Sequence, residues 1–365
     1  MKILHVIYDD IRNPWCGGGG ALRAARINEQ LARRHQVTVV TGNFPGAKNE
    51  RIQGVDYIRI GVKSSYILSR ISFTLRIPLY MKTYTSDIVI NDCSYFAPCF
   101  ATLYTKRPCV NIIHHVMGNH SFRIYSVLGL LPFIAEKIFL QTSVNILTPS
   151  KSVKDAIQQR YHPQNIQNIA NGVSGTLFEV KPEDKQFILF LGRIDIYMKG
   201  LDTLLASFSR IEDKEVRLRI AGSGKTGDVR KLQKLIGDYN LAGRVECLGR
   251  VSERTKIELL RTTLFLVMPS RFEGWGITAI EANAAGKPVL GTNIRGLSEA
   301  VVHNKTALLV EPGNIEELTA AMDYLIRNDE IRAHYGREGR IRAQGFSWES
   351  LSEKQAAFYQ SVLKI

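Results

Sequence analysis

The fold of this chain is decided by the stretch PSRFEGWGITAIEA at residues 269–282. An apolar run at residues 264–268 precedes it and predicts a buried strand, while the alanine-rich end of the stretch predicts a helix. Gly274 and Gly276 flank Trp275 between the two elements, and glycine lets the backbone lie close to a ligand. Backbone N–H groups at the start of the helix would then face an anion such as phosphate.

Two carboxylates, Glu273 and Glu281, bracket this turn. Such a pair suggests a glycosidase, but eight helical residues advance about 12 Å at ~1.5 Å each. Glycosidases hold their two carboxyl groups roughly 5–9.5 Å apart, so the spacing argues against hydrolysis. Because a carboxylate does not bind phosphate, we interpret both side chains as acceptors for sugar hydroxyl groups.

The length and composition predict a globular protein of two domains. The chain has 365 residues, of which 45% are hydrophobic and 22% are charged. Its formal net charge of +14 implies an anionic partner, but it does not choose among nucleic acid, anionic lipid and a phosphorylated substrate. No long run of Lys and Arg and no aromatic and basic platform occurs, so we expect no nucleic-acid partner. A basic nucleic-acid-binding protein remains the weaker alternative.

The five cysteines form no CxxC pair, which predicts reduced thiols and no structural zinc site. The N-terminus has an apolar core too short for a signal peptide. The longest apolar stretch, residues 124–135, is too short to span a bilayer. We therefore expect a cytoplasmic protein.

The N-terminal half opens with four consecutive glycines between a strand and a helix. Residues 3–8 predict a strand, glycines occupy residues 17–20, a helical pattern covers residues 21–34, and residues 37–41 predict a second strand. This order is the βαβ opening of a doubly wound sheet. The glycine spacing matches neither the dinucleotide fingerprint nor the P-loop, which disfavours a nicotinamide dehydrogenase. The loop either lets a phosphate or a sugar approach the backbone or is only a flexible connection.

A histidine pair, His114 and His115, follows the apolar run at residues 109–113. The carboxyl edge of a parallel sheet is where ligands bind in such folds. A histidine there could donate a hydrogen bond to a sugar hydroxyl or a phosphate, or could act as a general acid or base. The alternative is a purely structural histidine. We favour a functional role for one of the pair, and His114 over His115.

Residues 65–84 combine many apolar side chains with basic ones and contain no acid. Such a segment is a candidate surface for an anionic membrane or a lipid-linked acceptor. The alternative is a helix packed on the sheet with its basic residues in water. Pro78 is expected to break the helical pattern.

A second βα series begins with the apolar residues 188–191, which are followed by Gly192 and Arg193. The same loop contains Lys199. Arginine can bind two phosphate oxygens at once and lysine supplies a point charge, so the two side chains suit a diphosphate. Solvated surface charge is the alternative. A later strand of this half ends at Gly222, so small residues line the same edge.

In this order and spacing, the motifs resemble the E-x7-E family 4 of retaining glycosyltransferases. The resemblance extends over nearly the whole chain. It includes the glycine loop and residues 171–173, 192–193, 199–200, 222–224 and 249–251. It implies an α/β protein of the GT-B fold, with two Rossmann-like, doubly wound domains that face a central cleft. We expect these domains at residues 1–178 and 179–345, with a C-terminal helix at residues 346–365 returning to the first domain.

The resemblance also implies roles for the site residues, with Glu273, His114, Arg193 and Lys199 as the catalytic candidates. Glu281 would accept hydrogen bonds from the ribose, and Glu273 would hold the hydroxyls of the transferred sugar. Arg193 and Lys199 would neutralise the departing diphosphate. His114 would contact the donor sugar, with His115 as the other candidate. The remaining donor-binding candidates are Gly18, Gly19, Gly20, Gly192, Gly222, Arg250, Val251, Gly274, Trp275, Gly276 and Ile277. The bulky ring of Trp275 is expected to alter the sugar pocket.

The expected activity is retaining transfer of a hexose from a UDP- or GDP-linked sugar to a sugar or lipid-linked sugar. The resemblance implies front-face attack in which the leaving phosphate takes the acceptor's proton, with no metal and no cofactor. We expect a role in cell-envelope polysaccharide or glycolipid synthesis, in the cytoplasm or on the inner face of the membrane. A nucleotide-sugar epimerase of the same fold is the alternative, although the acid and base carboxylates that it needs are not apparent.

Overall fold

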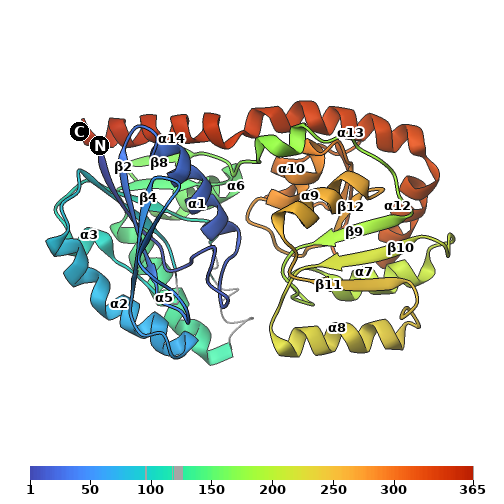
Figure 1. Cartoon of the computed structure of the whole chain (residues 1–365), viewed down its shortest axis with the longest axis horizontal. Coiled ribbons are helices and arrows are strands. Elements are labelled where there is room, and N and C mark those ends of the chain that lie inside the picture. Colours follow the sequence, from blue (N-terminus) through green and yellow to red (C-terminus); the bar gives the residue numbers. More distant parts are fainter. Residues whose placement is uncertain (95–96, 117, 119–125, 365) are drawn as a thin grey trace. The chain divides into compact units, whose positions relative to one another are not determined.

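The computed structural model describes residues 1–94, 97–116, 118 and 126–364, which form two compact units (Figure 1). Unit 1 comprises Met1–Asn171 and Trp348–Ile365, and unit 2 comprises Gly172–Ser347. The division falls earlier than the expected boundary at residue 178, because Val173 forms a β-bridge with Ser347. Arg340 also donates a hydrogen bond to the carbonyl oxygen of Val180 at 2.9 Å, which ties the segment to unit 2.

Unit 1 is built on an eight-stranded sheet in the order β3-β4-β2-β1-β5-β6-β7-β8. The strands are β1 (Lys2–Val6), β2 (Gln36–Gly42), β3 (Glu50–Ile52), β4 (Val55–Ile60), β5 (Ile88–Asp92), β6 (Cys109–Ile112), β7 (Asn145–Thr148) and β8 (Asn165–Asn168). All neighbouring strands pair in parallel except β3 and β4. The strand order reverses between β1 and β5, and ligands bind at such a switch point in doubly wound sheets.

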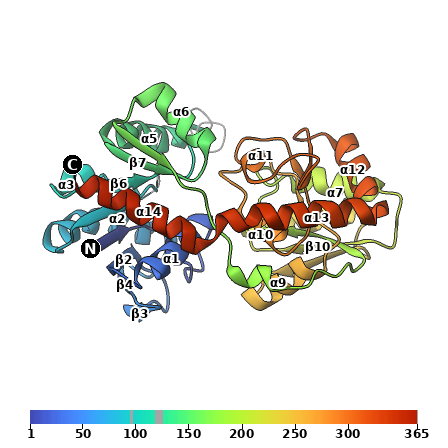
Figure 2. The ribbon, with the colours of Figure 1, turned by 90° about the horizontal axis from the view of Figure 1, so that it is seen from above.

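Helices cover both faces of this sheet, so its central strands β1, β5 and β6 are buried almost throughout. The helices are α1 (Gly19–Leu31), α2 (Tyr66–Thr83), α3 (Ala101–Tyr104), α5 (Leu130–Thr142), α6 (Lys151–Tyr161) and α14 (Trp348–Leu363), with the 3-10 turn η1 (Ser126–Gly129) before α5. On β1, Ile3 packs with α1 and α14, whereas the next residue, Leu4, packs with Phe73 and Ile77 of α2. Figure 1 shows α14 on one side of the sheet and α2 and α5 on the other, and Figure 2 shows α14 beside α1.

Helix α2 runs through Pro78, so the expected break at this residue is wrong. Ser65 caps the N-terminus, and its hydroxyl oxygen accepts a hydrogen bond from the backbone N–H of Leu68 at 3.2 Å. Four residues apart, Phe73 and Ile77 are fully buried against the sheet. Packing of this face offsets the hydrogen bond that proline cannot donate.

Unit 2 is built on a six-stranded parallel sheet in the order β11-β10-β9-β12-β13-β14. Its strands are β9 (Phe187–Leu191), β10 (Arg217–Ala221), β11 (Val245–Gly249), β12 (Leu266–Met268), β13 (Val289–Thr292) and β14 (Ala307–Val310). Its helices are α7 (Leu201–Arg210), α8 (Thr226–Asp238), α9 (Glu253–Thr262), α10 (Ile277–Ala284), α11 (Leu297–Ala300), α12 (Ile315–Arg327) and α13 (Asp329–Ala343), with the 3-10 turns η2 (Gly175–Phe178) and η3 (Gln344–Phe346). The order reverses between β9 and β12, which is the switch point of this unit.

Two further expectations concern the membrane and the cysteines. Within the described ranges, no helix combines the length and the apolar character that crossing a bilayer requires. All five cysteines are free thiols.

Candidate functional site

The switch point of unit 2 brings together the loops that follow β9 and β12. Gly200 has a φ of +65°, and a Cβ atom there would lie 2.0 Å from the carbonyl oxygen of Pro269. The backbone N–H of Arg271 donates to the carbonyl oxygen of Met198 at 3.0 Å. The two loops therefore touch backbone to backbone, and only glycine at position 200 permits this approach.

The side chain of Arg271 clamps the same two loops. Its guanidinium donates to the two carboxylate oxygens of Asp202 at 2.8 and 2.9 Å and to the carbonyl oxygen of Tyr197 at 2.9 Å. Arginine holds a carboxylate rigidly through two parallel hydrogen bonds. We did not single out Arg271 from the sequence, because its partner lies 69 positions earlier.

This arrangement places Lys199 against Glu273. The ammonium group of Lys199 contacts Glu273 Oε1 directly, and the hydroxyl of Ser270 donates to the same oxygen at 3.1 Å. Both charged side chains are largely buried. Two of the four residues predicted to be catalytic thus form one ion pair at the entrance to α10.

The turn between Glu273 and α10 is shaped by glycines. Gly276 has a φ of +78° and precedes the first residue of the helix. Gly296 packs directly against the turn: a Cβ atom at this position would lie 2.5 Å from the carbonyl oxygen of Glu273. Trp275 is only 3% exposed, and its ring packs edge-on against Phe346 with 5.1 Å between centroids. The tryptophan ring therefore belongs to the core of unit 2, and the turn can offer a ligand only its backbone at this position.

Glu281, on α10, is paired with a lysine that the sequence did not point to. Lys256 of α9 donates to Glu281 Oε1 at 2.5 Å and lies 3.0 Å from Glu253 Oε1. Burial would lower the pKa of Lys256, but the carboxylates of Glu281 and Glu253 outweigh it and raise the pKa above its ordinary value. Lys256 is thus charged at neutral pH.

Arg193 lies on the same sheet edge but is held loosely. Its side chain is 66% exposed, and its guanidinium is 4.0 Å from the carboxylate of Asp195. Behind it, the backbone of Gly192 touches Gly222 so closely that a Cβ atom on Gly222 would lie 1.7 Å from the Gly192 carbonyl oxygen. Arg250 and Val251 directly follow β11 on this edge, and Ile277 is the first residue of α10.

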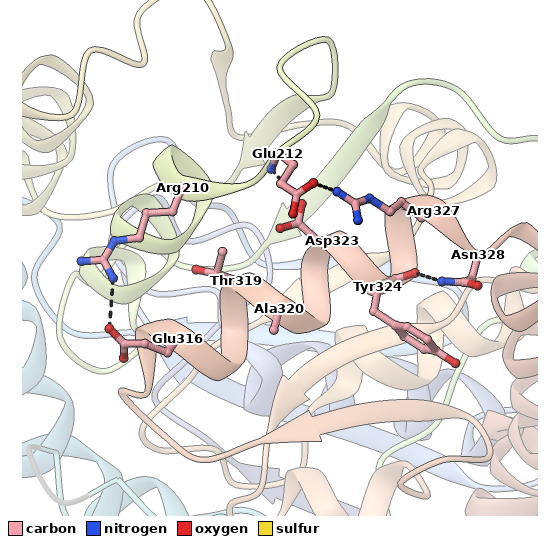
Figure 3. A pocket seen from close by; sticks show the side chains of 9 residues that line it. All are labelled: Arg210, Glu212, Glu316, Thr319, Ala320, Asp323, Tyr324, Arg327 and Asn328. Atoms are coloured by element: carbon pink, nitrogen blue, oxygen red, sulfur yellow. Dashed lines mark hydrogen bonds and ion pairs between the residues drawn. The ribbon is translucent and has the colours of Figure 1, made fainter.

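A cavity of about 210 Å³ opens at the ends of β10 and β11. It is lined by Ile194, Ile220, Gly222, Ser223, Gly224, Val229, Leu232, Gln233, Cys247 and Gly249. A larger surface pocket of about 640 Å³ lies elsewhere on unit 2, where α12 meets the end of α7 (Figure 3). Its charged side chains pair with one another, as Arg210 does with Glu316 at 3.0 Å, and none is a candidate site residue. The smaller cavity is therefore the one that belongs to the candidate site.

In unit 1, His114 is held by a buried carboxylate at the end of β5. Its Nε2 lies 2.8 Å from Asp92 Oδ1, while Asp92 Oδ2 is 3.6 Å from Nε2 of His5. Burial alone would raise the pKa of Asp92, but the neighbouring His114 and His5 together hold it well below its usual range. Asp92 is therefore an ionised carboxylate between two imidazoles. The sequence analysis missed it, since one aspartate after an apolar run carries no signal.

The glycine loop and His114 come together in this unit. A Cβ atom on Gly20, in the first turn of α1, would lie 3.3 Å from His114 Nε2. Gly18 and Gly19 immediately precede it, at the N-terminus of the same helix. His115 is exposed, and its side chain belongs to neither the Asp92 pair nor the Gly20 contact. Of the two histidines, His114 is thus the one that meets both Asp92 and the glycine loop.

Two parallel α/β units, each with glycines and charged side chains at the carboxyl edge of its sheet, define the GT-B class of glycosyltransferases. Residues 178–342 match the family model described as "Glycosyl transferases group 1", and residues 17–175 match that of "Glycosyltransferase Family 4". An uncharacterized glycosyltransferase of Methanocaldococcus jannaschii is 33% identical over 352 residues, which cover 96% of each chain. The chain therefore belongs to family 4 of the glycosyltransferases, and it is a glycosyltransferase.

Solved structures agree with this fold. Sucrose-phosphate synthase from Thermosynechococcus elongatus is similar with a TM-score of 0.85 and 20% identity, over 100% of both chains. HepE from Anabaena, solved in complex with UDP and glucose, is similar with a TM-score of 0.79 and 18% identity, over 99% of this chain and 100% of that one. The expected GT-B fold is confirmed.

Proposed function

We propose that this glycosyltransferase moves a hexose, with retention of configuration, from a UDP- or GDP-linked sugar to a hydroxyl group of a sugar or a lipid-linked sugar. The observation that carries the proposal is the pair formed by Lys199 and Glu273 at the start of α10. One partner suits a phosphate and the other suits sugar hydroxyls. A nucleotide sugar contains both groups next to each other, at the bond that breaks.

In the proposed reaction, the acceptor oxygen bonds to the anomeric carbon as the bond from that carbon to the phosphate oxygen breaks. The acceptor's proton passes to an oxygen of the departing diphosphate. Lys199 and Arg193 stabilise the charge that develops on that diphosphate, together with the backbone N–H groups of residues 274–277. Glu273 orients the sugar through its hydroxyls.

The remaining donor contacts follow the same edge. Glu281, held by Lys256, accepts hydrogen bonds from the ribose. The base lies near Arg250 and Val251, beside the cavity at the ends of β10 and β11. That HepE was solved with UDP and glucose supports a nucleotide-sugar donor. In unit 1, His114 contacts the donor sugar, and residues 18–20 offer backbone to the diphosphate or the acceptor.

We further propose that transfer needs no metal ion, because lysine and arginine supply the positive charge at the diphosphate. The proposed setting is cell-envelope polysaccharide or glycolipid synthesis in the cytoplasm, with peripheral contact to an anionic membrane. Full activity in excess EDTA is the expected result. Loss of transfer in EDTA, restored by Mg²⁺, would contradict the metal-free proposal.

A thermal-shift panel tests the donor. UDP, GDP, UDP-glucose, UDP-N-acetylglucosamine and GDP-mannose are compared with ATP and NADH as controls. A ligand at about 100-fold above its Kd stabilises the folded state by about 2.7 kcal/mol, which raises Tm by several degrees. Because Glu273 binds the sugar, Glu273→Gln should retain the shift caused by the nucleotide but lose the extra shift caused by the sugar. Glu316→Gln, on the exposed surface of α12, is the matched control.

The product distinguishes transfer from its alternatives. Release of the nucleoside diphosphate together with an α-linked product from an α-linked donor, detected by proton NMR, is expected. A β-linked product would overturn retention. An epimerised nucleotide sugar without net transfer would overturn the proposed function in favour of epimerase chemistry.

A further inference from the structure

The outer side of α2 exposes a stripe of large apolar side chains. Ile67, Ile71, Leu75 and Leu79 recur every four residues and are all exposed, Leu75 by 74%. This spacing places them along one side of the helix. The opposite side, which includes Phe73, is buried against the sheet. Helix α2 is therefore apolar on two sides, and the sheet accounts for only one of them.

Helix α5 also exposes large apolar side chains. Leu131 is 72% exposed and Ile134 is 44% exposed. We call Ile67, Ile71, Leu75, Leu79, Leu131 and Ile134 the apolar face. Exposed apolar side chains that occur singly need no explanation, but a contiguous group indicates an interaction site.

Strand register shows that α2 and α5 cover the same face of the sheet. Cys109 of β6 packs in the cluster that contains Phe73 of α2. Asn111 lies two residues on, hence on the same face, and it pairs with Ile146 of β7. Ile146 packs with Phe139 of α5. The outer sides of the two helices thus point away from one sheet face, as Figure 1 shows.

The charges around the apolar face are all of one sign. Arg76 and Lys82 of α2, Lys106 and Lys137 are exposed. Among the described residues of 63–86 and 97–144, the only acidic side chain is that of Glu136, and it is buried. A surface that is apolar and purely basic complements an anionic lipid bilayer, which takes up apolar side chains and attracts lysine and arginine.

This surface reaches the ligand edge of unit 1. Tyr66, at the start of α2, packs edge-on against Tyr8, which follows β1, with 6.5 Å between ring centroids. The Arg70 guanidinium lies 3.3 Å from the hydroxyl of Ser94, which follows β5. The carboxyl ends of β1 and β5 are also where the glycine loop begins and where Asp92 holds His114.

We propose that the apolar face docks unit 1 on an anionic bilayer and that the acceptor is a lipid-linked sugar. The inference rests on the proposed glycosyl transfer and gives its acceptor a chemical class. The head group of a lipid-linked acceptor emerges at the bilayer surface, beside the edge that carries His114 and the glycine loop. Docking brings this edge to an acceptor that does not dissolve in water.

Vesicle flotation at low salt tests the docking. The protein should float with phosphatidylcholine vesicles that contain about one-third phosphatidylglycerol, and not with pure phosphatidylcholine. The triple variant Ile71→Gln/Leu75→Gln/Leu79→Gln should bind at least about tenfold more weakly. The reason is that three apolar side chains that would enter the bilayer are replaced by polar ones. All three side chains are exposed, so the variant should keep its fold. The matched control replaces three exposed side chains of unit 2: Val302→Gln, Tyr324→Gln and Ile341→Gln.

Charge reversal tests the electrostatic part. Arg76→Glu/Lys82→Glu should weaken binding to the anionic vesicles by more than about tenfold, because each lost positive charge alone is worth about fivefold. Binding of the unchanged protein should also fall as salt is raised. Arg230→Glu/Lys231→Glu makes the same change of net charge on exposed residues of α8 and should bind as the unchanged protein does.

The outcomes separate docking from the proposed function. If the unchanged protein ignores anionic vesicles but a nucleotide sugar still stabilises it, the inference is overturned and the proposed function stands. If it floats but no nucleotide sugar stabilises it, the proposed function fails instead. Light scattering that finds a dimer, made monomeric by the triple glutamine variant, would show that a second copy covers the face and would overturn the inference. Transfer by the unchanged protein on vesicles is also compared for a soluble sugar and for the lipid-linked form of the same sugar. Equal rates would overturn the proposal that the acceptor is lipid-linked.

Discussion

Unit 1 and unit 2 share one plan, a parallel sheet with candidate side chains at its carboxyl edge, but they hold these side chains with different ion pairs. Unit 2 pairs glutamates with lysines, Glu273 with Lys199 and Glu281 with Lys256. Unit 1 instead places Asp92 between two histidines. A lysine ammonium group is a point charge that suits an anionic ligand, whereas a histidine ring is oriented by the hydrogen bond that one of its nitrogens makes. Unit 2 is thus suited to bind an anion, and unit 1 to hold an imidazole ring in one orientation.

The outward surfaces of the units also differ. In unit 1, α2 and α5 expose apolar side chains over a basic surface, whereas exposed charges of unit 2 often form pairs with opposite charges, as on α8 where Lys234 lies 2.6 Å from Asp238. Paired charges attract a bilayer little. Under the proposed function, unit 2 holds the nucleotide part of the donor and unit 1 faces the acceptor, and each variant below tests one of the two units.

The largest effect is expected at the pair of Lys199 and Glu273. Lys199→Met and Glu273→Gln should each lower transfer by about 10²–10³-fold, the range found when one preorganised polar group is removed from a transition state. Release of nucleoside diphosphate from the stabilising nucleotide sugar is measured, with circular dichroism as the check on folding. Near-normal rates in both folded variants would remove this pair from the site.

Removal of Lys256 tests whether Glu281 depends on its partner. Lys256→Met removes the lysine partner of a buried carboxylate, which should lower stability by about 3 kcal/mol and weaken donor binding more than it lowers kcat. Because the pKa of Lys256 is raised, the pair's contribution is complete below the ordinary lysine pKa of about 10.4 and disappears as pH rises through the raised value. The difference between variant and unchanged protein should therefore shrink in strongly alkaline buffer.

The control for this prediction is Lys234→Met. Lys234 makes an equally short ion pair with Asp238, but its side chain is 74% exposed. Exposed ion pairs contribute little to the free energy of unfolding, so Lys234→Met should hardly change the melting temperature or the donor affinity. If the two lysine variants change stability and donor affinity equally, then burial of the pair between Lys256 and Glu281 does not explain its effect.

A smaller effect is expected at Asp92 in unit 1. Asp92→Asn should reduce transfer through misorientation of His114, while binding of free UDP or GDP, which lack the sugar that His114 is proposed to contact, should stay unchanged. The lowered pKa of Asp92 means that its stabilising contribution is present above the ordinary value of about 3.9 and is lost as pH falls through the lowered one. Chemical unfolding at neutral and at acid pH measures this: the difference in free energy of unfolding between the variant and the unchanged protein should be smaller in acid. An unchanged rate at all pH values would reduce His114 and Asp92 to a structural pair.

The smallest effect is expected at Gly20. Its Cβ position is 3.3 Å from His114 Nε2, so Gly20→Ala should displace the imidazole by a few tenths of an ångström. Alanine favours the helix by up to about 1 kcal/mol, so stability should rise or stay level while transfer falls severalfold. Gly227→Ala, at the second position of α8, is the matched control, since a Cβ atom there meets nothing within 4 Å and the residue has no proposed ligand role. Equal rates for both alanine variants would separate the glycine loop from His114.

Much of this fold was predictable from local patterns. Apolar runs of β length ending in glycine or polar residues, as at Gly192 and Gly222, predict strands of a parallel sheet and the edge where ligands bind. Elements that depend on packing were less predictable. Helix α2 continues through Pro78 because Phe73 and Ile77 bury one side, which a local rule cannot anticipate. Trp275, similarly, was expected at the sugar pocket, but its ring packs against Phe346, 71 positions later in the chain.

The sequence by itself determined that two doubly wound units are present, that Glu273 precedes a glycine turn and that Glu281 lies within the helix that follows it. It did so because strand and helix periodicity, glycine turns and residue spacing are local properties of the chain. Only the tertiary structure decided the partners: Lys199 for Glu273, Lys256 for Glu281, Asp92 for His114, and the exposed apolar side of α2. These depend on loops and helices meeting across long sequence separations, where the geometry of packing and the burial of charge select each contact.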